Sequence, residues 1–318
     1  MNHRGLLVLL LLATGAAVSV PVAGAAALHL ATISRDHHSE RRVRHHHSAP
    51  RHRRRVRRWH RVPSHPVLRS SEALVLDVTD SRVLYERNAE VPTPIASISK
   101  LMTTLVVANA HQPLEQRLQV TRADRTSERS RLPIGTRLTR AQLFHLALMS
   151  SENRAAHTLA RNYPGGLAAC IRAMNAEARA LGMTHTHFVE PTGLSSHNIS
   201  TPQDLAKLVM AAARNPIIRR YSTSRGYVIR SGRHLVSYHN TDLLVSRPSW
   251  HIIVQKTGFI HQAGMCLVMQ TIIRHRTVVI VLLHSWGKYT RVADARRVKQ
   301  WMEAQLAHRP LRQVATRA

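Results

Sequence analysis

The chain has 318 residues, 44% of them hydrophobic, which supplies a real core and excludes a chain disordered throughout. Its 46 Lys and Arg against 17 Asp and Glu give a net charge of +29, which favours contact with anionic polymers or membrane surfaces. Only 13 aromatic residues occur and no stacking motif is visible, so this charge does not indicate a nucleic-acid-binding protein.

The first 27 residues have the three parts of an export signal. Arg4 is basic, residues 6–12 are an unbroken apolar run, and residues 23–25 are small, as a cleavage site requires. We therefore expect a signal peptide over residues 1–27 that is cleaved on export to the periplasm. Apolar character continues to about Leu28, so a retained membrane anchor is the alternative.

Residues 28–69 are predicted to be a disordered linker. Within them, residues 34–69 hold 12 Arg, eight His and three Pro against Asp36 and Glu40, with almost nothing apolar to bury. The histidine runs at 37–38 and 45–47 lack Cys or carboxylate partners, so we expect no metal site and no cofactor. We expect this basic linker to contact anionic envelope polymers by charge.

Residues 70–318 are predicted to form one folded domain, with order beginning near Ser71. Two strands are expected first, at 73–78 and 82–85, followed by a helix that starts near Ser97. Further helices are predicted at 143–149, 155–161 and 167–181. Another should start at Thr201, where a capping hydroxyl precedes Pro202.

Strands return at 251–254, 266–269 and 278–283, and a last helix follows over residues 292–306. Strands at both ends of the domain around a helical middle predict an α+β fold. In it, one antiparallel sheet is built from both ends of the domain and a helical lobe is inserted between them. Cys170 and Cys266 could form a disulfide, but buried free thiols are favoured.

Three short motifs occur in order: Ser97-Ile98-Ser99-Lys100, Ser151-Glu152-Asn153 and Lys256-Thr257-Gly258. Each alone could be a helix cap, a solvated lysine or a strand end. The occurrence of all three in this order is a more specific signal than any one motif. The lysines add to it, because the chain has only five Lys beside 41 Arg and two of the five lie in these motifs. A lysine can lose its proton when buried and arginine cannot, so a Lys three residues after a Ser on a helix suggests a nucleophile beside its base.

These motifs resemble the signature of the penicillin-recognising serine enzymes, the β-lactamases and penicillin-binding proteins. The sequences PIASISKLMT (94–103), FVEPTGL (188–194) and STPQDLA (200–206) are similar to the low-molecular-mass D-Ala-D-Ala peptidases. LMSSENRAA (148–156) and KTGFI (256–260) are most similar to their D-alanyl-D-alanine endopeptidase branch (penicillin-binding protein 7). The resemblance covers about residues 71–308 and implies a β-lactamase/transpeptidase-like fold.

The resemblance also implies roles for individual residues. Ser97 is the expected nucleophile and Lys100 its base, with Lys256 as a second cation nearby. The oxyanion is expected at the backbone N–H groups of Ser97 and Phe259. Ser151 would relay a proton to the leaving amine and Asn153 would orient the substrate and Lys100. Substrate binding is expected from Lys256, Thr257 and Gly258, the glycine allowing close approach of the substrate backbone.

Other candidate residues are weaker. Ser99 lies on the wrong helix face for attack, and Ser150 competes with Ser151 for the middle motif. His261 could line the cleft, but a surface or packing histidine is favoured. No His-Glu-x-x-His spacing supports a zinc peptidase.

The leading hypothesis is a serine D,D-endopeptidase that cleaves cross-links of peptidoglycan and is acylated by β-lactam antibiotics. A D-Ala-D-Ala carboxypeptidase is the near alternative; the chain ends soon after the last helix, which modestly favours the endopeptidase. A β-lactamase is less favoured because Glu190 does not fit the Glu-x-x-Leu-Asn register of the class A enzymes, so slow deacylation is expected. A noncatalytic wall-binding module is the alternative from another class.

Overall fold

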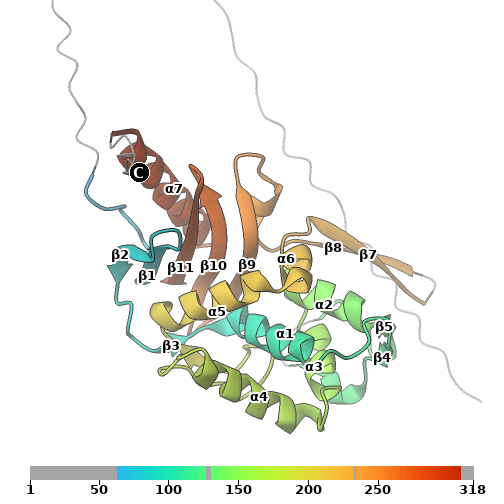
Figure 1. Cartoon of the computed structure of the whole chain (residues 1–318). Helices are drawn as coiled ribbons and strands as arrows, with labels where there is room; N and C mark the ends of the chain where they lie inside the picture. The colour runs from blue at the N-terminus through green and yellow to red at the C-terminus, as the bar shows by residue number, and fades with distance from the viewer. Residues whose placement is uncertain (1–62, 127–129, 233, 309–318) are drawn as a thin grey trace, which may run out of the picture. The chain divides into compact units, whose positions relative to one another are not determined.

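A five-stranded antiparallel sheet, built from both ends of the domain, forms the centre of the computed structural model, which describes residues 63–126, 130–232 and 234–308 (Figure 1). The strands lie in the order β2 (Arg82–Arg87), β1 (Glu72–Asp77), β11 (Arg276–Ser285), β10 (Gly264–Ile273) and β9 (His251–Ile260). β1 pairs with β11, so that Val75 lies opposite Ile280 and the first strand is joined to the last. The predicted α+β architecture is confirmed.

Helices cover both faces of this sheet. Successive apolar side chains of each strand point to opposite faces of the sheet. Val75 and Ile280 pack with α7 (Thr290–His308), whereas Leu74 and Val281 belong to the larger core, which includes α5 (Pro202–Arg214). As predicted, the Thr201 side chain caps α5 by accepting from the backbone N–H of Asp204. The sheet is therefore buried on both faces, and its two edge strands are β2 and β9.

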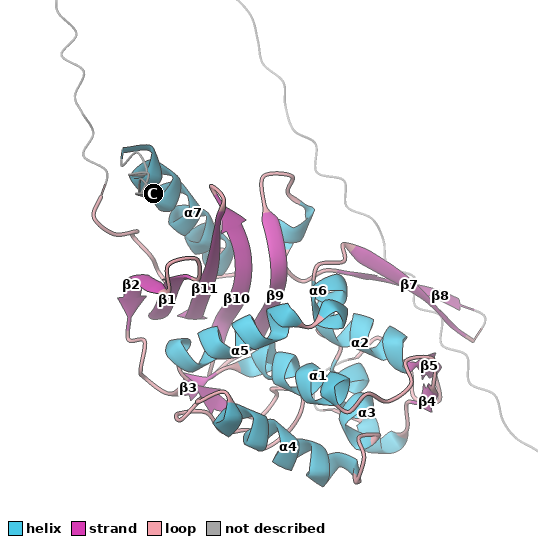
Figure 2. Ribbon diagram, viewed as in Figure 1, coloured by secondary structure: helices cyan, strands magenta, loops and turns pink. Residues whose placement is uncertain are grey.

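The helical lobe lies beside the α5 face of the sheet (Figure 2). It consists of α1 (Ser99–Asn109), α2 (Arg140–Met149), α3 (Asn153–Arg161), α4 (Gly166–Ala180) and α6 (Pro216–Ser222). α1 is the central helix, since every residue from Ser99 to Val107 is buried. The first turn of α1 is thus held in place by the lobe on one side and the sheet on the other.

Three short two-stranded sheets complete the fold. They are β3 (Thr93–Pro94) with β6 (Ile199–Ser200), β4 (Arg117–Gln119) with β5 (Arg137–Thr139), and β7 (Gly226–Ser231) with β8 (His234–His239). The sequence did not predict them. It also placed Lys256-Thr257-Gly258 at a strand end, whereas β9 continues to Ile260 because β10 pairs with it as far as Gly264.

The segment before β1 contacts α7. Leu68 is buried, the backbone N–H groups of Arg69 and Ser70 donate to Asp294 Oδ2 at 2.9 and 2.8 Å, and Trp301 Nε1 donates to the carbonyl of Pro63 at 3.0 Å. Ordered chain thus begins upstream of Ser71, inside the range expected to be linker. The predicted signal peptide and the rest of that linker lie outside the described residues.

No helix in the described ranges is both long and apolar enough to cross a membrane. Cys170 and Cys266 are buried free thiols, and burial raises the pKa of each to about 12.

Candidate active site

Ser97 lies in a short 3₁₀ turn, η1 (Ala96–Ile98), directly before α1. Ala96 has a positive φ of 50°, a conformation that costs free energy unless neighbouring contacts hold it. Gly193 supplies such a contact: a Cβ built on it would lie 1.9 Å from the Ala96 carbonyl oxygen and 2.7 Å from the Ser97 nitrogen. Two backbone segments therefore meet at the Ser97 turn, at a distance that only glycine permits.

Lys100 is completely buried and its amine faces Ser97. Its Nζ donates to Ser97 Oγ at 2.6 Å, to Asn153 Oδ1 at 2.7 Å and to the Thr192 carbonyl at 2.5 Å. Burial lowers the pKa of Lys100 to about 7, although attraction to Glu190 and Glu152 opposes the shift. Near neutral pH the amine can therefore exist without its proton, within hydrogen-bonding distance of a serine hydroxyl.

The carboxylate of Glu190 holds the loop that carries Thr192. It accepts hydrogen bonds from Thr192 N and Oγ1 at 2.7 and 2.6 Å, from Gly193 N at 2.5 Å and from Asn198 Nδ2 at 3.1 Å. The Thr192 carbonyl and Gly193 are thereby fixed against Lys100 and the Ser97 turn. No sequence motif had indicated this role for Glu190.

A second buried lysine pairs with a second serine. Lys256 Nζ, from β9, donates to Ser151 Oγ and to the Thr257 carbonyl, both at 2.8 Å. Ser150 instead donates to the carbonyl of Leu146 at 2.8 Å, one helical turn back in α2. Ser151, and not Ser150, therefore faces the site, as the motif register favoured.

The two buried lysines differ in what lowers their pKa values. For Lys100 we expected burial and a neighbouring cation to act together; burial lowers its pKa, and no cation contributes. Lys256 is also completely buried, and its pKa is lowered well below the usual value, first by burial and then by the charges of Lys100 and Arg291. Lys256 is therefore a poor permanent cation.

These groups open onto a cavity of about 510 Å³ beside the edge strand β9. Its lining includes Ser97, Ser151, Asn153, Thr241, Thr257, Gly258, Phe259, His261 and Arg291. A Cβ on Gly258 would lie 3.1 Å from the Ser97 nitrogen, so β9 runs directly past the serine. His261 does line the cavity and packs edge-on against Phe259, while Ser99 is buried and bonded to Asn198.

Arg291 is a charged cavity residue that no sequence motif indicated. It comes from the first turn of α7, and its guanidinium donates to the Gly258 carbonyl at 3.2 Å. Burial lowers the pKa of Arg291, yet an arginine keeps its charge at any relevant pH. Arg291, rather than Lys256, is therefore the fixed positive charge of the cavity. No motif marks it, because arginine is common throughout this chain.

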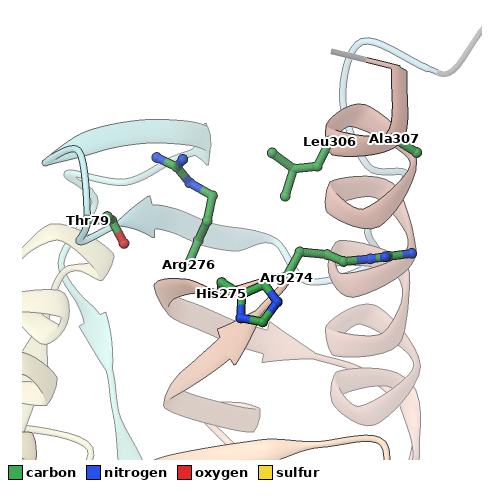
Figure 3. A pocket seen from close by; sticks show the side chains of 6 residues that line it. All are labelled: Thr79, Arg274, His275, Arg276, Leu306 and Ala307. Atoms are coloured by element: carbon green, nitrogen blue, oxygen red, sulfur yellow. The ribbon is translucent and has the colours of Figure 1, made fainter. Parts of the chain in front are cut away.

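A pocket at the opposite end of the sheet has no comparable chemistry (Figure 3). It lies between the β10–β11 turn and the last turns of α7, and its lining residues are Thr79, Arg274, His275, Arg276, Leu306 and Ala307. Arg276 is already paired with Asp77 and Asp80. Across the residues that the structure describes, no group of three His, Cys, Asp or Glu side chains could hold a metal ion.

The site combines a serine and a lysine at the start of a buried helix, a second serine–lysine pair across the cavity, and an edge strand beside both pairs. Such a site can carry out acyl transfer through a covalent serine ester. The fold and these groups define the class of penicillin-recognising serine enzymes.

Comparison with known proteins agrees with this class. Residues 60–286 match peptidase family S11, described as D-alanyl-D-alanine carboxypeptidase. The D-alanyl-D-alanine endopeptidases of Pseudomonas aeruginosa and Escherichia coli are each 44% identical to the chain, over 76% of its length and 80% and 79% of theirs. The Streptomyces K15 DD-transpeptidase structure has a TM-score of 0.71 at 26% identity, covering 76% of this chain and all of that one. The chain belongs to peptidase family S11, the serine D-Ala-D-Ala peptidases.

Proposed function

We propose that the protein is a serine D,D-endopeptidase that cleaves peptide cross-links of peptidoglycan through an acyl-enzyme on Ser97, and that it works in the periplasm. The observation that carries the mechanism is the 2.6 Å contact between Ser97 Oγ and the buried amine of Lys100, whose pKa is about 7. The 44% identity to two proteins named D-alanyl-D-alanine endopeptidase supports the choice of reaction.

In the first step, neutral Lys100 accepts the Ser97 proton while Oγ attacks the carbonyl carbon of a D-alanyl peptide bond. The carbonyl oxygen becomes an oxyanion, which we assign to the backbone N–H groups of Ser97 and Phe259. The close approach of Gly258 to the Ser97 nitrogen supports this pairing of turn and strand.

The carbon–nitrogen bond then breaks and leaves an ester on Ser97. Ser151 gives its proton to the departing amine and is reprotonated through Lys256, which contacts Ser151 Oγ. The proton that Lys100 took from Ser97 replaces the one that Lys256 gives up, so Lys100 is neutral again. Asn153 holds the Lys100 amine. Neutral Lys100 next accepts a proton from a water molecule whose oxygen attacks the ester carbonyl. The bond to Ser97 then breaks, the second product leaves as a carboxylic acid, and Lys100 returns the proton to Ser97 Oγ.

Substrate binding is assigned to the open side of the cavity. Thr257 and Arg291 would hold a substrate carboxylate, and Gly258 would let the peptide backbone lie against β9. Arg291 is suited to this role because its charge is permanent and partly desolvated. Lys256 would act on Ser151 and on the strand rather than on the substrate directly.

The β-lactam acyl-enzyme is expected to break down slowly. The nearby carboxylates are engaged: Glu190 by its own loop and Glu152 by Ser130 Oγ and the backbone N–H of Arg154. Neither is free to activate water, which disfavours a β-lactamase. Sustained rapid hydrolysis of nitrocefin would contradict this conclusion.

The decisive test uses muropeptides of defined cross-linking, with the Ser97→Ala variant as the control. Conversion of dimers into monomers by the parent protein, and not by the variant, is the expected result. Release of terminal D-alanine without dimer cleavage would favour the carboxypeptidase alternative. That activity is named for a Streptomyces relative 29% identical to the chain.

A further inference from the structure

One segment of the folded domain next to the active-site cavity carries positive charge and no negative charge. From Arg214 to Thr241 the sequence has six arginines and no Asp or Glu, whereas residues 166–204 have two arginines and three acidic residues. The segment contains α6 and the β7–β8 hairpin, which extends away from the main sheet in Figure 1. We call this hairpin, together with Arg225 directly before it, the arginine arm.

The base of the arginine arm is fastened to the strand that lines the cavity. Asn240 donates to the carbonyls of Ser222 and Ser224 at 2.8 and 2.7 Å, and Gln255 Nε2 donates to Ser222 O and Asn240 Oδ1 at 2.6 and 2.9 Å. Gln255 directly precedes Lys256. Two residues after the end of the arm, Thr241 Oγ1 forms a 2.6 Å hydrogen bond with Thr257 Oγ1. The arm therefore starts at the rim of the active site and is held rigidly there.

The two faces of the arm differ, as the alternation of strand side chains requires. On the inner face, the Tyr227 ring lies against His145 of α2, with centroids 4.1 Å apart and planes tilted by 32°, and Tyr227 accepts a hydrogen bond from Gln142. Tyr238 is buried. On the outer face, Val228 is 51% and Leu235 67% exposed. The inner face is thus packed against the helical lobe and the outer face is open.

The arginines of the arm are available for binding. Arg225 and Arg230 are exposed, and neither guanidinium has an ion pair, hydrogen bond or ring contact within the described ranges. Arg230 lies directly across from Leu235 in the hairpin, so the open face presents cationic and apolar groups side by side. This combination fits a peptide that carries both carboxylates and small apolar side chains.

We propose that the arginine arm binds a second, acidic peptide of the same cross-linked wall polymer, outside the bond being cleaved. This rests on the proposed function, since the substrate is then a polymer whose alanine-rich peptides bear free carboxylates. A six-residue strand spans about 20 Å, so the arm reaches well beyond the cavity. Carboxylates of the bound peptide would pair with Arg230 on the open face and with Arg225 at the base of the arm, and its methyl groups would contact Val228 and Leu235.

The test compares two substrates with the full-length double variant Arg225→Gln/Arg230→Gln. On intact sacculi stripped of attached anionic polymers, kcat/KM should fall about fivefold at low salt, which is what two exposed ion pairs contribute together. On soluble cross-linked dimers it should change less than about twofold. The loss should shrink at high salt, because exposed charge pairs are screened.

A matched control removes the same charge elsewhere: Arg172→Gln/Arg179→Gln, on the exposed side of α4, should leave both substrates unaffected. The conservative pair Arg225→Lys/Arg230→Lys should keep most of the activity on sacculi. Equal losses on sacculi and dimers, or equal losses in the control variant, would overturn the proposal. So would a loss seen only on unstripped sacculi, which would assign the arm to the attached anionic polymer instead.

The outcome is separable from the proposed function. If the parent protein cleaves no soluble dimer, the endopeptidase assignment fails whatever the arm variants do. If it cleaves dimers and sacculi and the arm variant loses neither, only the proposal for the arginine arm fails. Penicillin labelling of each variant verifies that the site around Ser97 is intact.

Discussion

Acylation of Ser97 should rise about tenfold between pH 6 and pH 8 and then level off. Burial lowers the pKa of Lys100 to about 7. The amine is then neutral in roughly one molecule in ten at pH 6 and about nine in ten at pH 8. Only the neutral amine can accept the Ser97 proton, so the rate increases with pH in proportion to it. A lysine of ordinary pKa would instead give about a hundredfold rise with no plateau in this range.

The assay is the second-order rate constant for labelling with a fluorescent penicillin, measured from pH 5 to pH 9. A rate that still rises tenfold per unit above pH 8 would refute the lowered pKa of Lys100, and a rate that is flat throughout would refute its assignment as the base.

A second perturbation tests the electrostatic cause of this pKa. Glu190 raises the pKa of Lys100 by attraction, so Glu190→Gln should move the midpoint of the pH profile to lower pH. Damage to the loop that Glu190 organises would lower the plateau rate without moving the midpoint. Glu177→Gln, on α4, is the matched control and should leave the midpoint unchanged. A midpoint that moves upward in Glu190→Gln would contradict the reasoning.

Three more predictions concern other parts of the molecule. Lys100→Arg should abolish penicillin labelling, because an arginine cannot accept the Ser97 proton. Lys256→Arg should keep a smaller but measurable part, because an arginine can still donate a hydrogen bond to Ser151 although it cannot pass on a proton; equal loss in both would reopen the assignment of the base. Asp294→Asn should lower the free energy of unfolding in urea by about 2 kcal/mol, because this buried carboxylate accepts hydrogen bonds from Arg69, Ser70 and Arg297. The exposed Asp80→Asn should cost less. Deleting residues 34–62 should weaken sedimentation with sacculi at low salt but not penicillin labelling; equal sedimentation would remove the role proposed for the linker.

Much of the fold was predictable because its signals are local. The strands of the main sheet are short apolar, β-rich runs, and α5 begins where a capping threonine precedes a proline. Ser97 and Lys100 are three residues apart on one helical turn, so their contact follows from helix geometry. The boundary of β9 was less predictable, because the partner strand β10 determines where pairing stops.

The β7–β8 hairpin illustrates what local signals miss. Its strands bury little more than Ile229 and Tyr238, so their hydrophobic pattern is weak. The role of Glu190 could not be predicted for a different reason. Its hydrogen-bond donors are mainly backbone N–H groups of its own loop, and no residue pattern specifies the shape of that loop.

The choice between lysine and arginine explains which half of the site could be found in advance. A general base must be unprotonated before it can accept a proton. A buried lysine can meet this condition and an arginine cannot, which makes Lys100 conspicuous in a chain with five lysines. A group that holds a carboxylate needs a charge that survives burial, and arginine meets this need. Arg291 therefore shares its residue type with 40 others and is distinguished by its position in α7, from which it contacts the Gly258 carbonyl and Met265. Replacing Arg291 with lysine in such surroundings would put the charge itself at risk, since burial lowers the pKa of both lysines already there.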